Sequence, residues 1–218
     1  MTNYSLSEID ALCRKACRGA GYSWGLAEDA GKAIRWLSAY GLPGAEVLAE
    51  LLETVANDLQ SYIPELKDTE CSNQKNALCP VFCGAVINDQ GHLLAQNKAL
   101  TFHSMLYPLL ALPQAARISE AFEMQVSIAF GDTSIVCSRK DISFLAQPNW
   151  KKKTGDIVCY RAESDSDEYA NKLFPSPLSR PVSAEAITIL EGYAHKTYAP
   201  ATEASRLAGA GAGLSDND

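Results

Sequence analysis

Three apolar stripes at helical spacing fill the first 64 residues, and they constrain the fold of this chain more than any other feature. The first begins at Ser5–Glu8, a capping box in which the serine and glutamate side chains each bond a free amide of the first turn. Ser23 can cap the second helix, and Pro43-Gly44 opens the third. The apolar members of the stripes are Leu6, Ile9, Cys13, Ala16 and Cys17; Leu26, Ala30, Ala33 and Leu37; and Leu48, Leu52, Val55, Ala56 and Leu59. This pattern predicts a compact unit of three helices.

After residue 80 the apolar period changes from about 3.6 to about 2 residues, which predicts strands. Residues 65–80, between the two periods, form a polar link. We expect residues 81–87 and 92–96 to be paired strands, joined by a turn at 88–91. The most regular alternation spans residues 122–130, which we expect to be the clearest strand.

The remaining elements are predicted from turn and cap signals. Gly131-Asp132 predicts a two-residue hairpin that leads into a partner strand at residues 133–137. Residues 156–161 form another strand pattern, and residues 183–195 form a last helix with a serine cap. Residues 105–118 are apolar but interrupted by two prolines, so they fit either a strand or a loop.

Helices at both ends and antiparallel strands between them predict an α+β chain. We expect a helical unit at residues 1–64, a polar link at 65–80, an antiparallel β-rich region at 81–182, and a C-terminal helix with a glycine-rich tail at 183–218. The last part should pack within the same globule. A chain of 218 residues buries roughly 70% of its unfolded surface, so an ordinary apolar core suffices.

The charge balance and the lack of long apolar stretches exclude several classes of partner. The chain has 26 acidic and 19 basic residues and a formal net charge of −7, so broad attraction to nucleic-acid phosphates is not expected. No stretch approaches the ~20 apolar residues that span a bilayer, and the polar N-terminus does not resemble a signal peptide. We therefore expect a cytoplasmic protein with no membrane or nucleic-acid partner, whose seven cysteines are reduced.

No sequence motif identifies a metal, a cofactor or a nucleophile. Cys13 and Cys17 lie in the apolar stripe of the first helix, where a free thiol packs like a small hydrophobe. The spacing of the three cysteines between residues 71 and 83, taken with His92, does not match structural zinc sites. His103 is interpreted as a loop histidine, and no glycine-rich nucleotide motif follows a strand. No metal site is predicted, and the cofactor stays unknown.

The C-terminal stretch has an unusual physical character. Gly209, Gly211 and Gly213 alternate with alanine, and successive amides in such a loop can turn inward to form an anion nest. Arg206 offers a planar fork suited to a carboxylate or phosphate, and Asp216 offers oxygen ligands. The alternative is a frayed tail, because ordering ten residues costs on the order of 10–20 kcal/mol of backbone entropy. Both alternatives stay open at this point.

Motifs at both ends of the chain carry a family resemblance. They are Cys17–Gly21 (CRGAG), Trp24–Gly31 (WGLAEDAG) and Ser205–Asp218 (SRLAGAGAGLSDND). With them the chain resembles an uncharacterised proteobacterial family of domain-of-unknown-function proteins, which the middle of the chain matches more loosely. Cys17 stands where the family pattern has a small residue, which counts against a cysteine site there. The resemblance favours an ordered, functional tail but implies no activity.

The two ends combine into one functional hypothesis, in which the tail folds onto the turn between the first two helices and forms a polar pocket. The protein would then be an enzyme acting on a small polar or carboxylate-bearing metabolite, with Glu28 or Asp216 transferring protons. The substrate-binding residues would be Arg18, Trp24, Arg206, Gly209, Gly211, Gly213 and Ser215. The alternative role for Trp24 and Glu28 is packing and compensation of the helix dipole. The rival function is a non-catalytic partner subunit that inserts its tail into a neighbouring chain of a homo-oligomer.

Overall fold

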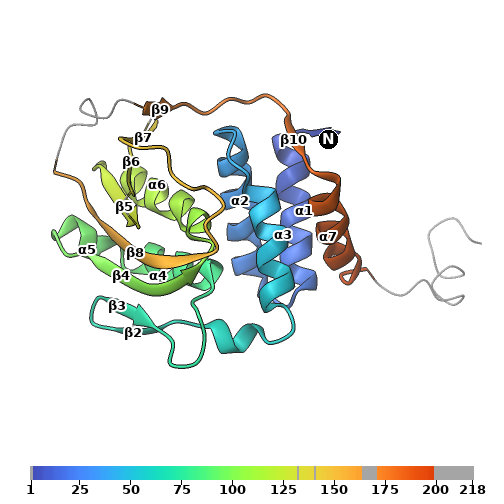
Figure 1. Cartoon of the computed structure of the whole chain (residues 1–218), viewed down its shortest axis with the longest axis horizontal. Coiled ribbons are helices and arrows are strands. Elements are labelled where there is room, and N and C mark those ends of the chain that lie inside the picture. Colours follow the sequence, from blue (N-terminus) through green and yellow to red (C-terminus); the bar gives the residue numbers. More distant parts are fainter. Residues whose placement is uncertain (1, 132, 140, 164–170, 199–218) are drawn as a thin grey trace, which may run out of the picture.

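The computed structural model describes residues 2–131, 133–139, 141–163 and 171–198. Over these ranges the chain has seven α-helices, α1 to α7, and a mixed sheet of eight strands, which confirms the predicted α+β class. A layer of helices stands beside the sheet (Figure 1). Among the described helices, none combines the length and the apolar character needed to cross a bilayer.

The helical layer contains the three predicted helices and the predicted C-terminal helix. These are α1 (Leu6–Gly19), α2 (Trp24–Ala39), α3 (Gly44–Val55) and α7 (Ala184–His195). The capping box at the start of α1 is confirmed, because Glu8 N donates to Ser5 Oγ at 3.2 Å and Ser5 N donates to the Glu8 carboxylate at 2.8 Å. Serine caps also begin α2 and α7. A short 3-10 helix, η1 (Leu59–Tyr62), follows α3.

Helix α7 packs against α1 and α3, so the first and the last described helices lie in one layer (Figure 1). A two-stranded sheet ties the same regions together, because β1 (Thr2–Tyr4) pairs antiparallel with β10 (Arg180–Val182). The Arg180 side chain donates to the carbonyl oxygens of Ser38 and Ala39 at 2.8 and 2.9 Å. These contacts fix the start of α7 relative to the end of α2.

The large sheet has the strand order β2-β3-β4-β8-β5-β6-β7-β9. Its strands are β2 (Glu65–Lys67), β3 (Glu70–Ser72), β4 (Leu100–Leu106), β5 (Val126–Phe130), β6 (Thr133–Cys137), β7 (Ile142–Phe144), β8 (Thr154–Arg161) and β9 (Asn171–Leu173). The predicted hairpin register is confirmed, with Phe130 opposite Thr133. The predicted strand at residues 156–161 is also confirmed, as part of β8. The pairings are antiparallel except that between β3 and β4, which is parallel. Two of the strands, β2 and β3, come from the stretch that we expected to be a polar link.

The predicted strands at residues 81–87 and 92–96 are wrong. They lie in α4 (Pro80–Asp89) and α5 (Gly91–Ala95), and the expected turn at 88–91 falls at the junction of these helices. Pro80 occupies the first turn of α4, where its missing amide leaves no hydrogen bond unmade. Pro80, Cys83, Gly84 and Ile87 are buried at helical spacing. The other apolar side chains of α4 are half-buried and pack against the core as well: Val81, Phe82 and Val86. A helix that is apolar all round cannot be told from a buried strand by its period.

The stretch at residues 105–118, which fitted either a strand or a loop, is mostly helical. Beyond the end of β4 it forms the 3-10 helix η2 (Pro108–Ala111) and most of α6 (Leu112–Ala121). Its two prolines stand in the first turns of these helices, where proline is tolerated. The strand expected at 122–130 begins only at Val126, because Phe122 caps α6. Helices α4 and α6 pack between α2 and the sheet.

The seven cysteines are buried and free, and they belong to the core. Burial raises the pKa of each thiol, to about 11 for Cys71 and about 12 for Cys159. The Tyr22 hydroxyl lies 3.1 Å from Cys79 Sγ, and burial likewise raises the Tyr22 pKa. The interpretation of Cys13 and Cys17 as core residues is therefore confirmed.

The close packing of α1 on α7 gives a matched pair of glycine variants. A Cβ atom at Gly19 would lie 1.8 Å from the Tyr193 carbonyl oxygen, whereas one at Gly25 would meet no atom within 4 Å. Gly19→Ala is expected to lower the free energy of unfolding by about 1–3 kcal/mol, since backbone must move to admit the methyl group. Gly25→Ala should leave it unchanged or raise it by up to about 1 kcal/mol. Urea denaturation measures both, and equal stability of the two variants would contradict the described contact.

The buried thiols predict loss of stability in alkali. Thiols of the unfolded chain ionise near the ordinary pKa of 9.0, while the native thiols keep their protons. Above pH 9 the native state therefore binds more protons than the unfolded state, and the free energy of unfolding should fall as the pH rises from 8 to 10. Urea midpoints across this range measure the effect. A thiol reagent at pH 8 provides the control: rapid reaction of several cysteines in the native protein would refute the burial.

Candidate functional site

The structure brings together two of the predicted site residues, Arg18 and Trp24, at the turn between α1 and α2. The Arg18 guanidinium lies over the Trp24 ring, 4.7 Å from its centroid, and donates to the Tyr22 carbonyl oxygen. Trp24 is 69% exposed, so it is not a core residue. A guanidinium stacked on an indole keeps further N–H donors for an acceptor outside this turn.

Glu28 lies one turn further along α2 and faces solvent. Its carboxylate accepts from Lys32 Nζ at 2.9 Å. The hydrogen bond and charge of Lys32, with a smaller effect from Arg14, hold the pKa of Glu28 below its ordinary value. This environment stabilises the carboxylate, as a charge partner or a proton acceptor requires. A role for Glu28 in proton transfer stays a prediction.

The other predicted site residues lie outside the described residues. They are Arg206, Gly209, Gly211, Gly213, Ser215 and Asp216. The last residue that the structure describes, Tyr198, contacts α1: Lys15 Nζ donates to its hydroxyl at 3.3 Å and lies 5.4 Å from its ring centroid. Lys15 stands three residues before Arg18, hence on a neighbouring part of the same helix face. The described chain therefore ends in contact with the helix that carries Arg18.

His103 does not lie in a loop, as was predicted, but in β4. Its Nε2 atom is 3.4 Å from a carboxylate oxygen of Glu70 on the neighbouring strand, and both side chains are exposed. Over the part of the chain that the structure describes, no group of three histidine, cysteine or acidic side chains is arranged to hold a metal ion.

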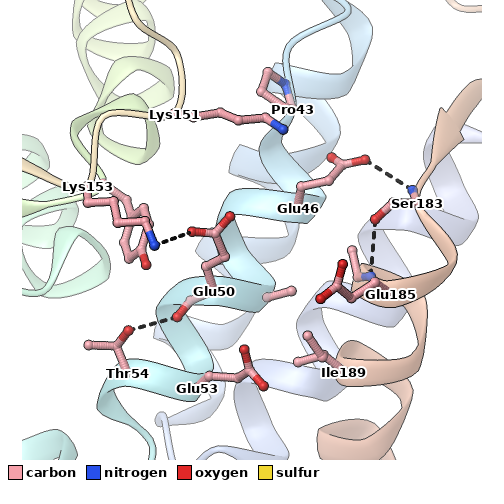
Figure 2. A pocket seen from close by; sticks show the side chains of 13 residues that line it. Pro43, Glu46, Glu50, Glu53, Thr54, Lys151, Lys153, Ser183, Glu185 and Ile189 are labelled. Carbon is pink, nitrogen blue, oxygen red and sulfur yellow. Dashed lines mark hydrogen bonds and ion pairs between the residues drawn. The ribbon is translucent and has the colours of Figure 1, made fainter.

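The sequence did not indicate a groove of about 680 Å³ between α3, α7 and the loop after β7. We call it the α3–α7 groove. Three glutamates of α3, Glu46, Glu50 and Glu53, line one wall, and Glu185 lies on the opposite wall in the first turn of α7 (Figure 2). Lys151 and Lys153 reach it from the loop. Four carboxylates thus share the groove with two ammonium groups. The apolar lining consists of Pro43, Ala49, Ala186 and Ile189.

Hydrogen bonds set the shape of the α3–α7 groove. Glu46 accepts from the Ser183 backbone amide at 3.2 Å, and Ser183 Oγ accepts from Ala186 N at 3.2 Å, which fixes the start of α7 against α3 (Figure 2). Lys153 Nζ lies 3.6 Å from the Glu50 carboxylate and so ties the loop to the middle of α3. No ion pair or hydrogen bond of the Glu53 or Glu185 side chain occurs within the described ranges.

Tyr107 also lines the α3–α7 groove and is the most unusual of its residues. Its backbone is left-handed (φ 42°, ψ 66°), a strained conformation for a bulky side chain. The bond from its amide to the Lys153 carbonyl oxygen, 2.8 Å, holds it there. The residue is only 5% exposed, yet its hydroxyl has no hydrogen-bond partner among the described residues. The ring of Tyr107 is therefore buried, while its hydroxyl is open to the groove and makes no hydrogen bond to a described residue.

Comparison with known proteins gives a family match over the first third of the chain. Residues 4–79 match the family described as "Protein of unknown function (DUF3726)". No curated protein matches the chain. Among solved structures, the malate dehydrogenase of Entamoeba histolytica is similar, with 11% sequence identity, a TM-score of 0.38, and coverage of 89% of this chain and 68% of that one. So low a TM-score does not establish a shared fold. The chain is thus similar, from α1 to the start of α4, to a family of unknown function.

Proposed function

We propose that the protein binds a small polar metabolite in the α3–α7 groove. The observation that carries this proposal is the free hydroxyl of Tyr107, a residue that is only 5% exposed and lines the groove. The ring is buried but the hydroxyl is open to the groove and bonds no described residue, so it can exchange a hydrogen bond with a ligand atom there. Strained, buried residues of this kind gather at functional sites more often than elsewhere.

The charges of the α3–α7 groove support a ligand with charged ends. Lys151, on the loop, is available to a carboxylate, as expected for a carboxylate-bearing metabolite. Glu53 and Glu185 are available to a cation. Between the charges, Ala49 and Ile189 offer apolar contact for a short carbon skeleton. The site is therefore suited to a small molecule and not to a flat macromolecular surface.

Tyr107→Phe tests this function, because it removes the hydroxyl and keeps the ring. We expect the wild-type protein to gain thermal stability with at least one compound of a metabolite collection. The variant should bind that compound roughly tenfold more weakly, the effect of one hydrogen bond. Thermal shift and calorimetry measure both quantities. Tyr4→Phe, on β1 and away from this groove, should bind like the wild type. Equal affinity of Tyr107→Phe and wild type would contradict the proposal.

The second candidate function is the predicted anion site of the C-terminal segment, which the contact between Lys15 and Tyr198 favours. Twenty residues follow Tyr198, enough chain to reach the Arg18–Trp24 turn, since an extended residue spans about 3.5 Å. Arg18 and Arg206 would bind a carboxylate or phosphate, and Glu28 or Asp216 would handle protons. The rival role, a partner subunit that inserts this segment into a neighbouring copy, would use the exposed Trp24 as its contact.

Removing residues 206–218 separates these two roles. In both, the truncated protein should fold with an unchanged circular dichroism spectrum, because the described residues already form a continuous core among themselves. As an anion site, full-length protein should bind a small carboxylate or phosphate, and both the truncation and Arg18→Gln should lose that binding. As a partner subunit, full-length protein should be an oligomer that dissociates on truncation. A monomer without anion binding in either form would refute both roles. Light scattering and calorimetry provide the measurements.

A further inference from the structure

The strand at one edge of the large sheet has an unpaired side. Strand β2 (Glu65–Lys67) pairs with β3 and with no other described strand. All three of its residues are exposed, and it lies at the margin of the sheet, away from the helical layer (Figure 1). A strand with a free edge offers backbone donors and acceptors to another chain, so its chemistry decides what can pair with it.

The register of the β2–β3 hairpin determines which backbone groups face outward. A two-residue turn joins the strands and places Lys67 opposite Glu70, the pair that closes the hairpin. The closing pair exchanges the ladder hydrogen bonds, so the next residue of β2, Leu66, turns its amide and carbonyl groups away from β3. The Ile63 carbonyl oxygen fits this alternation, because Asn73, directly after β3, donates to it from its side chain at 2.9 Å. Leu66 therefore offers one donor and one acceptor at the edge.

The side chains of β2 complement a second copy of the same strand. In an antiparallel pair with its two-fold axis at Leu66, Glu65 of each copy lies opposite Lys67 of the other. Opposite charges directly across a ladder are favourable, whereas a parallel pairing in register would place like charges together. Neither charged side chain makes a hydrogen bond or an ion pair within the described ranges. Both are therefore available to a second copy.

The apolar core continues to the same edge. Leu66 lies opposite Cys71 on β3, and Cys71 lies opposite Phe102 on β4, so the three side chains share one face of the sheet. Cys71 and Phe102 are fully buried, whereas Leu66 is 37% exposed. The apolar row thus ends in a partly exposed leucine. A second Leu66 across the two-fold axis would cover it and remove apolar surface from water.

Pro64, directly before β2, limits the length of the free edge. It stands two residues before Leu66, at the next outward-facing position, and it has no amide to donate. An extended peptide running along this edge would lose a ladder hydrogen bond at Pro64. The symmetric pairing is centred on Leu66, where both the donor and the acceptor are present. The edge therefore favours a short, symmetric partner over a long peptide.

We propose that the protein forms a two-fold symmetric dimer through β2, which joins the two sheets into one. At its centre the amide and carbonyl groups of Leu66 exchange two hydrogen bonds with those of the second copy. Glu65 and Lys67 pair across the ladder on the face opposite the leucines. The interface is small, so monomer and dimer exchange in dilute solution. The dimer uses neither the α3–α7 groove nor residues 206–218, and it therefore goes beyond the functions proposed above.

Charge reversal at the two ends of β2 tests this register. Sedimentation equilibrium of the full-length wild type, from about 1 μM to about 1 mM, should show the mass rising from one chain toward two. Glu65→Lys and Lys67→Glu each place like charges across the ladder twice, and each should weaken self-association about threefold to thirtyfold. An equimolar mixture of the two variants should recover wild-type association, because every charge pair between unlike chains is again opposite.

Glu191→Lys is the matched control, because it makes the same change of net charge as Glu65→Lys at an exposed position of α7. It should dimerise like the wild type, and so should the protein without residues 206–218. A truncated protein that becomes monomeric would assign the contact to the C-terminal segment and refute the β2 dimer.

Two further results would also refute the β2 dimer. One is a wild-type protein that stays monomeric up to about 1 mM. The other is a mixture of Glu65→Lys and Lys67→Glu that associates no better than either variant alone. Neither result bears on the α3–α7 groove, whose function Tyr107→Phe tests separately.

Discussion

The packing of α7 on α1 and α3 is the contact on which both candidate sites depend. It is fixed near both ends of the helix. At the start, Glu46 accepts from the Ser183 amide, and near the end the Tyr193 hydroxyl donates to the Leu52 carbonyl oxygen at 3.1 Å while its own carbonyl lies against Gly19. The α3–α7 groove opens beside the first of these contacts, and the Arg18–Trp24 turn lies beside the last. A helix of 12 residues, about 18 Å long, thus separates two unlike charge environments.

The sequence predicted the elements whose boundaries are set by local chemistry. The capping box at Ser5 and the serine cap of α7 needed only their neighbours in the chain. The hairpin from Phe130 to Thr133 likewise follows from its turn. The sequence of α4 predicts a strand because the helix is apolar on every face, and a helix without a polar face shows no helical period. The secondary structure of that segment is decided by its position between α2 and the sheet, which is a property of the tertiary fold.

Of the two candidate sites, the sequence likewise predicted one and did not indicate the other. Arg18 and Trp24 are close in sequence, and their contact was predictable from the turn that joins α1 and α2. The α3–α7 groove was not, because Tyr107, Lys153 and Glu185 meet there from three distant parts of the chain. The one local signal was the row of glutamates on α3, and a solvated helix face shows the same pattern. Tyr107 comes directly after β4 and has a left-handed backbone. Glycine or asparagine is the residue expected in that conformation, so the sequence gives no sign of it.

The row of glutamates also has an energetic consequence that favours a cationic ligand over an empty groove. Like charges three or four residues apart on a helix destabilise it by about 0.2–0.5 kcal/mol per pair. Lys153 offsets this repulsion at Glu50, and the amide of Ser183 offsets part of it at Glu46. Glu53 faces Glu185 across the groove, and no described side chain neutralises either. An ammonium group bound between Glu53 and Glu185 would reduce the repulsion between these two carboxylates and that between Glu53 and Glu50. The repulsion slightly lowers the stability of the helix, and binding of such a group would restore it.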